Sequence, residues 1–248
     1  MQRSPLQSLD DALAQLLAQA QPLTQLQTLC TFEADGRVLA ADAVSPLHIP
    51  PWDNSAMDGY ALNLADWQGE PLAVSQRILA GQAPEPLQPG SCARIFTGAP
   101  LPAGADTVEM QENAEILADG RVRFLEPIKV GQNVRPQGQE TRAGEVVLPA
   151  GTRLGPVELG LAASLGCAVL VVRRRPRVAV VSTGDELVEP GRSLGPGQIY
   201  NSNRSLLCAW LQRLGCEVRD AGILPDDAQR TREALAALGD ADLILSTG

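Results

Sequence analysis

Apolar stretches alternate with helix-like stretches toward the C-terminal end of this chain, and this alternation limits the possible fold most strongly. Residues 178–181 form a continuous apolar run of strand length, and residues 216–224 and 243–245 are two further predicted strands. Between them, residues 203–214 and 227–238 carry apolar side chains at helical spacing, and we expect Asn203 to cap the first of these helices. The order strand, helix, strand, helix, strand predicts a parallel sheet with right-handed crossovers.

Polar residues follow each of the three predicted strands. They are Ser182-Thr183-Gly184-Asp185-Glu186, Pro225-Asp226-Asp227 and Ser246-Thr247-Gly248. Ligands of an open parallel sheet bind outside the carboxyl ends of the strands, where glycine lets backbone N–H groups approach a phosphate and hydroxyls add donors. Carboxylates beside a phosphate favour a Mg²⁺ ion between them. The alternative is that Asp185 and Asp227 only cap turns or helices.

Composition narrows the class of protein. The 248 residues carry a net charge of −9, and 44% of them are hydrophobic. This balance favours a folded chain and argues against nucleic-acid binding, so an anionic ligand needs a local set of donors. The absence of a signal peptide or membrane-spanning run predicts a soluble cytoplasmic protein. Five scattered cysteines and a single histidine, His48, favour buried free thiols over a metal site or a disulfide framework.

The rest of the chain predicts a helix-containing domain that a β unit interrupts. One helix is expected from its cap Ser8 to Pro22 and another from Pro156 to Gly166. Short apolar stretches separated by Pro and Gly predict an all-β unit between them. The basic run at residues 173–177 is interpreted as a solvated hinge. The predicted fold is thus an α/β multidomain protein with a helix-containing domain at residues 1–44 and 145–174, an inserted β domain at 45–144, and an incomplete parallel α/β domain at 175–248.

Three stretches match the specific residues of one protein family, in addition to the hydrophobic periodicity described above. They are Asn54-Ser55-Ala56-Met57-Asp58-Gly59-Tyr60-Ala61, then Arg94-Ile95-Phe96-Thr97-Gly98-Ala99-Pro100, and then Ser182-Thr183-Gly184-Asp185-Glu186-Leu187 followed by Gly197-Gln198-Ile199-Tyr200. In this order they resemble the molybdopterin molybdenumtransferases, whose relatives include the E domain of gephyrin. The resemblance extends along nearly the whole chain.

The resemblance implies a transferase of molybdenum cofactor biosynthesis. Such an enzyme inserts molybdenum from molybdate into adenylylated molybdopterin and releases AMP in a step that needs a divalent cation, here expected to be Mg²⁺. Matching motifs imply catalytic roles for Asp58, Thr97, Glu140, Glu186 and Asp226, with Glu186 and Asp226 also as metal ligands. We expect the molybdopterin to be bound by the remaining strand-end residues, Ser182, Thr183, Gly184, Asp185, Ser246, Thr247 and Gly248.

The resemblance also implies a homodimer, in which the β unit of one subunit faces the α/β domain of the other, and the molybdopterin adenylyltransferase as a partner. The sequence departs from the family at two places. Glu140 stands where aspartate is common, and the family continues beyond Ser246-Thr247-Gly248 into a further loop and domain. We therefore expect a truncated chain whose residues 243–245 form an exposed sheet edge.

Two other interpretations stay open at this point. A catalytically incomplete chain of the same family would act as a pterin-binding or dimerising scaffold. A molybdopterin adenylyltransferase would use a similar α/β domain, but it would lack the β unit around Asp58. Without the resemblance, Asp58 and Thr97 each precede a glycine and form turns, while Glu140 is a solvated surface charge.

Overall fold

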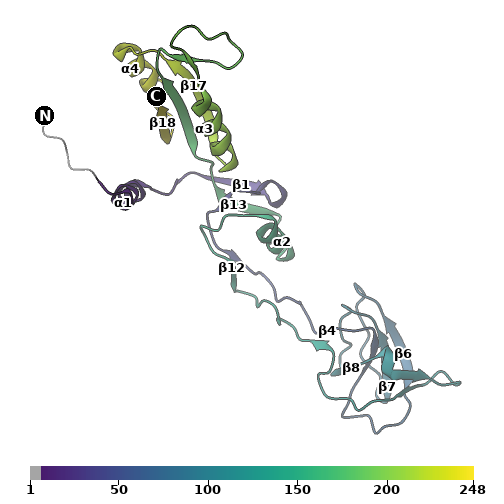
Figure 1. The fold of residues 1–248 in the computed structure, drawn as a ribbon. Coiled ribbons are helices and arrows are strands. Elements are labelled where there is room, and N and C mark those ends of the chain that lie inside the picture. Colours follow the sequence, from purple (N-terminus) through teal and green to yellow (C-terminus); the bar gives the residue numbers. More distant parts are fainter. Residues whose placement is uncertain (1–6) are drawn as a thin grey trace. The chain divides into compact units, whose positions relative to one another are not determined.

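The computed structural model describes residues 7–248 as a mixed α/β protein of two compact units (Figure 1). The first unit comprises residues 1–41 and 149–248, and the second comprises residues 42–148. The second unit therefore interrupts the first in sequence. Residues 1–6, which belong to the first predicted domain, lie outside the described residues. Within residues 7–248, no helix has the length and apolar character needed to cross a membrane.

A three-stranded parallel sheet dominates the first unit. β14 (Arg177–Thr183) lies at its centre, between β17 (Glu217–Leu224) and β18 (Leu243–Thr247), and both neighbours run parallel to it. The predicted strand order along the chain is confirmed. β18 is the edge strand on its side of the sheet, and it leaves Leu243 half exposed.

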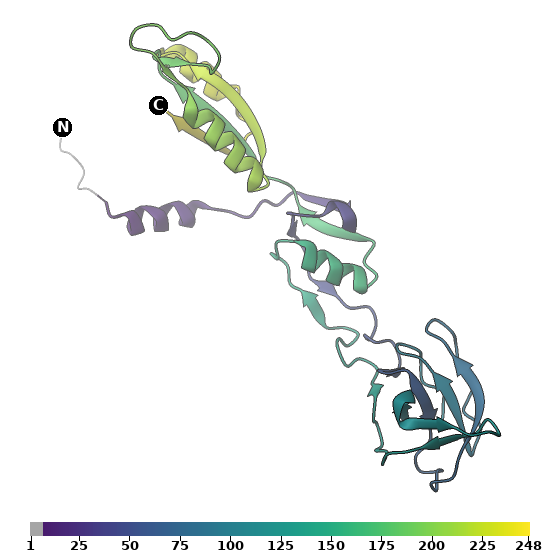
Figure 2. The same cartoon turned by 45° about the vertical axis from the view of Figure 1, so that its right-hand side comes forward.

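Two helices cover opposite faces of this sheet (Figures 1 and 2). Val178 and Val180 pack with Leu211 of α3 (Ser202–Arg213), whereas Ala179 and Val181 pack with Leu238, just after α4 (Ala228–Ala236). Successive residues of a strand point to opposite faces, so the continuous apolar run of β14 is the pattern of a strand that is buried on both sides.

The cap of α3 differs from the sequence prediction. Asn201 is the N-cap, because its side chain accepts a hydrogen bond from Arg204 N. Asn203 lies inside the first turn of the helix instead, and its amide donates to Thr247 Oγ1 at 2.8 Å. Asparagine is a favoured N-cap residue, so residue type alone does not distinguish Asn201 from Asn203. The strand β16 (Ile199–Tyr200) ends directly before Asn201 and so sets where the helix begins. The predicted cap Ser8 of α1 (Leu9–Gln19) is confirmed.

A smaller antiparallel sheet completes the first unit. β13 (Val169–Arg173) lies between β1 (Leu26–Cys30) and β2 (Val38–Leu39). The 3-10 helix η1 (Thr31–Glu33) contacts α2 (Pro156–Ser164), which begins at the predicted proline. β15 (Leu187–Val188) pairs with β16 in the loop that follows β14.

The second unit is built from strands and one short 3-10 helix, η2 (Gln111–Asn113), over residues 42–148, all of which are described. Its main sheet has the order β6 (Ala73–Ile78), β7 (Ser91–Ile95), β5 (Gly59–Leu62), β8 (Thr107–Met110). Three two-stranded ladders surround it: β9 (Ala114–Ile116) with β10 (Val122–Phe124), β4 (Asn54–Ser55) with β11 (Val134–Arg135), and β3 (Ala43–Val44) with β12 (Val146–Leu148). Alternate residues of β5 supply two separate cores, Ala61 to one face and Tyr60 with Leu62 to the other.

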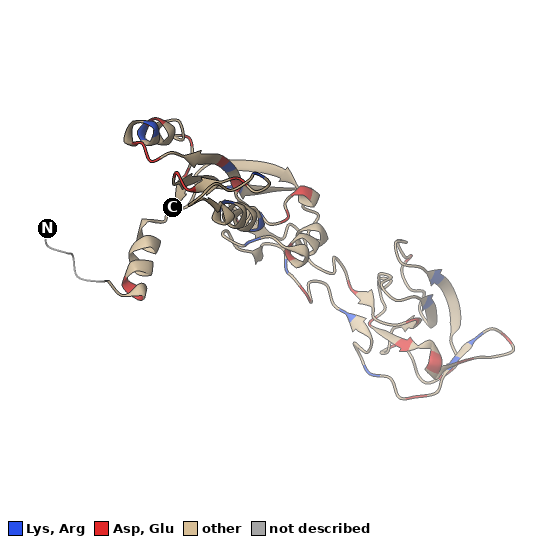
Figure 3. Ribbon diagram, turned by 45° about the horizontal axis from the view of Figure 1, so that its top comes forward, with Lys and Arg blue, Asp and Glu red and all other residues tan. Residues whose placement is uncertain are grey.

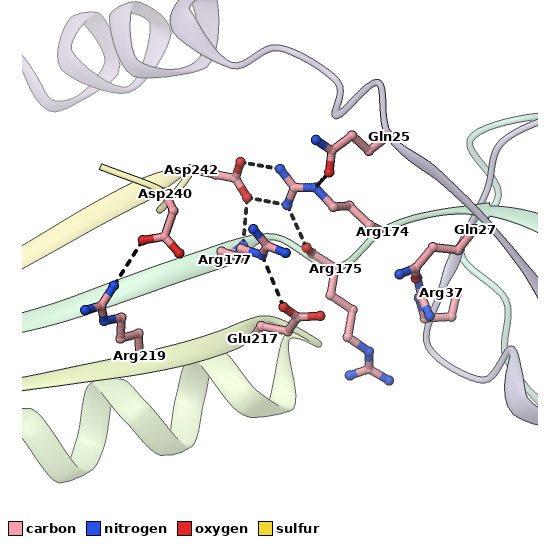
Figure 4. A network of polar contacts seen from close by, with 10 residues as sticks. All are labelled: Gln25, Gln27, Arg37, Arg174, Arg175, Arg177, Glu217, Arg219, Asp240 and Asp242. Carbon is pink, nitrogen blue, oxygen red and sulfur yellow. Dashed lines mark hydrogen bonds and ion pairs between the residues drawn. The ribbon is translucent and has the colours of Figure 1, made fainter. Parts of the chain in front are cut away.

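The basic run at residues 173–177 is solvated only in part, because the Arg177 side chain is half exposed whereas Arg174 is packed. Arg174 is mostly buried and donates two hydrogen bonds of 2.6 Å to Asp242, one to Gln25 Oε1 and one to the carbonyl of Arg175 (Figure 4). The Asp242 carboxylate also accepts from Arg177 N at 2.8 Å. This network joins the segment before β1 to the first residue of β14 and to the residue that precedes β18. The Arg174 side chain holds the pKa of Asp242 at about 2, with help from the Arg177 amide.

We expect Asp242→Asn to lower the free energy of unfolding by about 1–2 kcal/mol, because it removes charge-assisted hydrogen bonds to Arg174. The pKa of Asp242 is about 2 in the folded protein, below its ordinary value of 3.8. The contribution of ionised Asp242 to the free energy of unfolding is therefore complete above pH 3.8 and is lost as the pH falls toward 2. Urea unfolding of both proteins, repeated from neutral to acid pH, measures this. An undiminished difference between the two at pH 2 would contradict the assigned role.

Gly59 lets β5 approach β8 closely. A Cβ at this position would lie 2.0 Å from the carbonyl oxygen of Glu109, so Gly59→Ala is expected to cost about 1–3 kcal/mol of stability through overpacking. Gly160 in α2 is the matched control, because a Cβ there meets nothing within 4 Å. Gly160→Ala is expected to add about 0.5–1 kcal/mol by favouring the helix. Thermal unfolding of the two variants measures both effects, and equal melting temperatures would contradict the packing argument.

Candidate functional site

The parallel register brings the three predicted strand ends to one edge of the sheet. Ser182 lies opposite Ile223 on one neighbour and Thr247 on the other, and Thr183 lies opposite Leu224. A Cβ added to Gly248 would be 3.0 Å from Thr183 Oγ1, so the ends of β14 and β18 are in contact. Two hydroxyl-bearing segments therefore lie side by side at this edge.

Hydrogen bonds tie this edge to the neighbouring loops and helices. Asp226 N, after β17, donates to Asp185 Oδ1 at 3.2 Å, after β14. Asn203 of α3 donates to Thr247, as described above. An open groove beside these contacts is lined by Thr183, Asp226 and Asp227 together with residues of α4. The structure thus places predicted site residues from two strand ends on one surface of the first unit.

Gly184 and Glu186 form a compact turn at the end of β14. Gly184 has φ +142°, and a Cβ there would lie 2.4 Å from Glu186 Oε2. Glycine is required at this position because the Glu186 side chain folds back over the backbone. The turn is closed by a hydrogen bond from Leu187 N to the carbonyl of Gly184 at 3.2 Å. Glu186 remains exposed to solvent.

The strand-end residues differ in their access to a ligand. Ser182 is fully buried, and its Oγ has no hydrogen-bond partner within residues 7–248. Thr183 and Thr247 are half buried, whereas Asp185, Ser246 and Gly248 are exposed. The hydroxyl of Ser182 therefore lies behind the edge that the other residues form.

Asp58 and Thr97 meet in the second unit. Asp58 Oδ1 accepts hydrogen bonds from Thr97 N and Thr97 Oγ1, both at 2.8 Å. The Thr97 backbone amide, then its hydroxyl and the nearby Arg94 guanidinium, lower the pKa of Asp58 below its ordinary value. The carboxylate is thereby kept ionised at the protein surface, joining the turn before β5 to the end of β7.

Glu140 lies in a different part of the second unit's loops. Its backbone N–H donates to the carbonyl of Ile49 at 2.9 Å, and its side chain is exposed. Among the described residues, no hydrogen bond joins Glu140 to Asp58 or Thr97. Sequence reasoning missed the contact that holds this loop, a 2.7 Å hydrogen bond from Gln137 N to Asp53 Oδ1. The signal was present, because Asp53 directly precedes the motif that begins at Asn54.

The donor set of the first unit fits a Mg²⁺ ion that is shared with a phosphate. Within residues 7–248, no group of three or more His, Cys, Asp or Glu side chains is placed to hold a metal. Mg²⁺ commonly takes one or two protein carboxylates and completes its shell with substrate phosphates and water. Asp227 caps α4 and Asp185 accepts from Asp226 N, which leaves Glu186 and Asp226 as the exposed carboxylates at this edge whose oxygens accept no hydrogen bond within residues 7–248.

Cysteine and histidine contribute no cluster to either unit. All five cysteines are free, and burial raises the pKa of Cys92 to about 12. Cys30 is exposed, so the expectation of buried thiols is wrong for that residue. His48 Nδ1 accepts a hydrogen bond from Ala143 N at 3.3 Å and serves the local loop.

Thr97→Val is expected to raise the pKa of Asp58 part of the way to its ordinary value. The substitution removes the hydroxyl donor but keeps the backbone amide, which is the larger cause of the lowered pKa. Thr97→Ser is the matched control, because it retains the hydroxyl and should leave the pKa unchanged. A carboxyl-carbon NMR titration of Asp58 in the three proteins measures the shift. Equal values for Thr97→Val and the parent would show that the hydroxyl does not bind the carboxylate.

Comparisons with known proteins find family matches for two stretches of the chain. Residues 7–166 match the family described as MoeA N-terminal region (domain I and II), and residues 179–248 match the probable molybdopterin binding domain. The chain is 43% identical over 244 residues to a molybdopterin molybdenumtransferase of Haemophilus influenzae, which covers 97% of this chain and 60% of the relative. A molybdopterin molybdenumtransferase of a Nostoc species is 43% identical over 223 residues, covering 87% of this chain and 51% of the relative.

Solved structures show the same likeness. A molybdopterin biosynthesis moeA protein from Pyrococcus horikoshii OT3 superposes with a TM-score of 0.88 and 32% identity, covering 96% of this chain and 65% of that one. A second structure from that organism gives a TM-score of 0.83 at 31% identity. The chain thus spans about 60% of the length of such relatives. Because the family match covers residues 7–166, well over half of the sequence, this chain belongs to the family of the MoeA N-terminal region.

Proposed function

We propose that the protein to which this chain belongs inserts molybdenum from molybdate into adenylylated molybdopterin and releases AMP. One observation carries the proposal: hydroxyls, glycines and exposed carboxylates from three strand ends meet at the carboxyl edge of one parallel sheet. This edge is where open α/β sheets bind their ligands. The names of the relatives supply the substrate class, and the sheet edge supplies a site with suitable chemistry.

The strand-end residues would divide the work by their chemistry. Thr183, Ser246 and Thr247 offer hydroxyl donors to pterin or phosphate oxygens, and exposed Gly248 would let backbone N–H groups approach a ligand. Gly184 would contribute by forming the turn over which the Glu186 side chain folds. Ser182 and Asp185 support this surface from behind and from the side. Glu186 and Asp226 would hold Mg²⁺. When bound there, the ion would supply positive charge that offsets the negative charge of the substrate phosphates.

Asp58, Thr97 and Glu140 are proposed to contribute from the β unit. The ionised Asp58, held by Thr97, is suited to orient a donor group or water of the substrate rather than to give up a proton near neutral pH. Exposed Glu140 would add a second carboxylate. These roles are assigned by the motifs that contain the residues.

A homodimer is part of the same proposal. α1 has no buried residue, and its Leu9, Leu13, Leu16 and Leu17 side chains are all exposed. An apolar helical stripe of this kind is stabilised by burial against a partner surface.

Since the substrate carries an adenylyl group, an adenylyl-transferring enzyme must supply it, and the molybdopterin adenylyltransferase is the expected partner. We propose the cytoplasm as the place of reaction.

The proposal is tested with the whole protein to which this chain belongs. Purified protein, adenylylated molybdopterin, molybdate and Mg²⁺ should yield AMP, measured by chromatography. Glu186→Ala is expected to reduce the rate about 100-fold or more, because it removes a proposed carboxylate ligand of the Mg²⁺ ion that offsets the phosphate charge. The Mg²⁺ concentration needed for half-maximal rate should rise for Asp226→Asn.

Glu112→Ala is the matched control, since Glu112 is an exposed carboxylate of η2 outside the predicted site. It should release AMP at the parent rate. Unchanged AMP release by Glu186→Ala would sink the assignment of the sheet edge. Dimerisation without AMP release by the parent protein would favour the scaffold interpretation instead.

A further inference from the structure

A basic cavity lies at the opposite end of the parallel sheet from the candidate site. Its volume is about 250 Å³, and its lining includes five arginines and no acidic residue: Arg37, Arg153, Arg173, Arg174 and Arg175. The chain has 20 Lys and Arg in all and a net charge of −9, so a quarter of its cationic side chains line one cavity of an acidic protein. Figure 3 shows acidic residues distributed over both units, which makes this concentration of positive charge a local exception.

Arg174 is the one arginine of the five whose charge is matched by a carboxylate, within the part of the chain that the structure describes. Its partner is Asp242, at 2.6 Å. Arg37 donates to Gln27 and to the carbonyl of Arg173 at 2.8 Å, and Arg173 donates to the carbonyl of Leu23. These acceptors are neutral. They satisfy N–H groups but leave the positive charges uncompensated.

Arg153 and Arg175 are held loosely. Arg153 Nη2 reaches the carbonyl of Leu214 at 3.4 Å, and Arg175 Nη1 reaches the carbonyl of Gly215 at 3.5 Å. Both distances are at the long limit for a hydrogen bond. A guanidinium has five N–H donors, so most donors of these two residues are available (Figure 4, for Arg175).

The electrostatic environment of the cavity favours a bound anion. Arg37 is 7% exposed, and burial lowers its pKa, with a further contribution from the nearby charge of Arg175. Glu217 acts in the opposite direction, but it is 55% exposed at its side chain and pairs with Arg177 at 3.5 Å. Positive charges thus face one another in a partly desolvated space. An anion in that space would relieve their repulsion.

Helix capping explains part of the arrangement but not all of it. The carbonyls of Leu214 and Gly215 end α3, and arginines favour the negative end of a helix. One cation at the end of the helix serves that purpose. Capping does not account for Arg37 and Arg173, which approach the same cavity from the antiparallel sheet.

We propose that this arginine cavity is a binding site for a small phosphate-type oxyanion, held mainly by the guanidinium groups of Arg153 and Arg175. A tetrahedral dianion matches several converging guanidinium forks in both charge and geometry. The site is separate from the candidate site, because it lies at the amino end of β14, whose seven residues span roughly 20 Å at about 3.3 Å per residue. It goes beyond the proposed transfer reaction and does not depend on it.

Calorimetric titration of the 248-residue chain with inorganic phosphate, at constant ionic strength set by sodium chloride, tests the proposal. The parent should bind one phosphate, and its melting temperature should rise with phosphate concentration. Arg175→Gln and Arg153→Gln should each weaken binding about tenfold, the loss expected for charge-assisted hydrogen bonds. Arg175→Lys keeps the charge but not the planar fork, so an intermediate affinity is expected. Arg153 is exposed, and its variant keeps the proposal testable if Arg175→Gln fails to fold.

Two control variants locate the bound ion. Arg142→Gln removes one exposed guanidinium from the other unit and should bind phosphate like the parent. Thr183→Val alters the sheet edge of the candidate site and should also bind like the parent. The proposal is overturned if the parent shows no phosphate binding at constant ionic strength, or if Arg175→Gln and Arg153→Gln both bind as tightly as the parent. Loss of binding in Thr183→Val with retention in the arginine variants would overturn it as well, by placing the ion at the strand ends.

Discussion

The pairing of β14 with two parallel neighbours is the constraint on which the rest of the first unit depends. A strand that is hydrogen-bonded on both sides and covered on both faces needs an unbroken apolar sequence, and residues 178–181 provide it. Parallel pairing also collects the carboxyl ends of three strands at one edge and their amino ends at the other. The two edges are therefore separate surfaces, and the loops at each edge supply its charged and polar side chains.

The two edges differ in charge. At the carboxyl edge, Glu186 and Asp226 are exposed beside hydroxyls and glycines, a set that suits a phosphate only when a cation lies between them. At the amino edge, Arg174 is neutralised by Asp242, while the surrounding arginines have neutral acceptors or long contacts. An anion there needs no cation. The two edges of the sheet would therefore bind an oxyanion in different ways, through a metal ion held by carboxylates at the carboxyl edge and through arginines at the amino edge.

In the β unit, a tight backbone contact and a charged surface contact lie next to each other in the sequence. Gly59 permits the close approach of β5 to β8, and the preceding residue, Asp58, is held by the amide and the hydroxyl of Thr97. The motif around Asp58 thus has a structural role and a proposed chemical one. The low pKa of Asp58 follows from the structural role, because two donors stabilise its charged form.

Sequence by itself determined the mixed α/β class, the order of the strands and helices in the C-terminal part, the cap Ser8, the start of α2 at Pro156, and the family, because periodicity, caps and motifs are local properties of the chain. It also predicted that the hydroxyl and acidic segments follow strands. The tertiary structure alone decided that Asn201 rather than Asn203 caps α3, that Ser182 is buried, that Asp58 meets Thr97, and that Arg174 pairs with Asp242. These outcomes depend on residues distant in sequence that fold into contact, and no local pattern of charge or hydrophobicity carries that information.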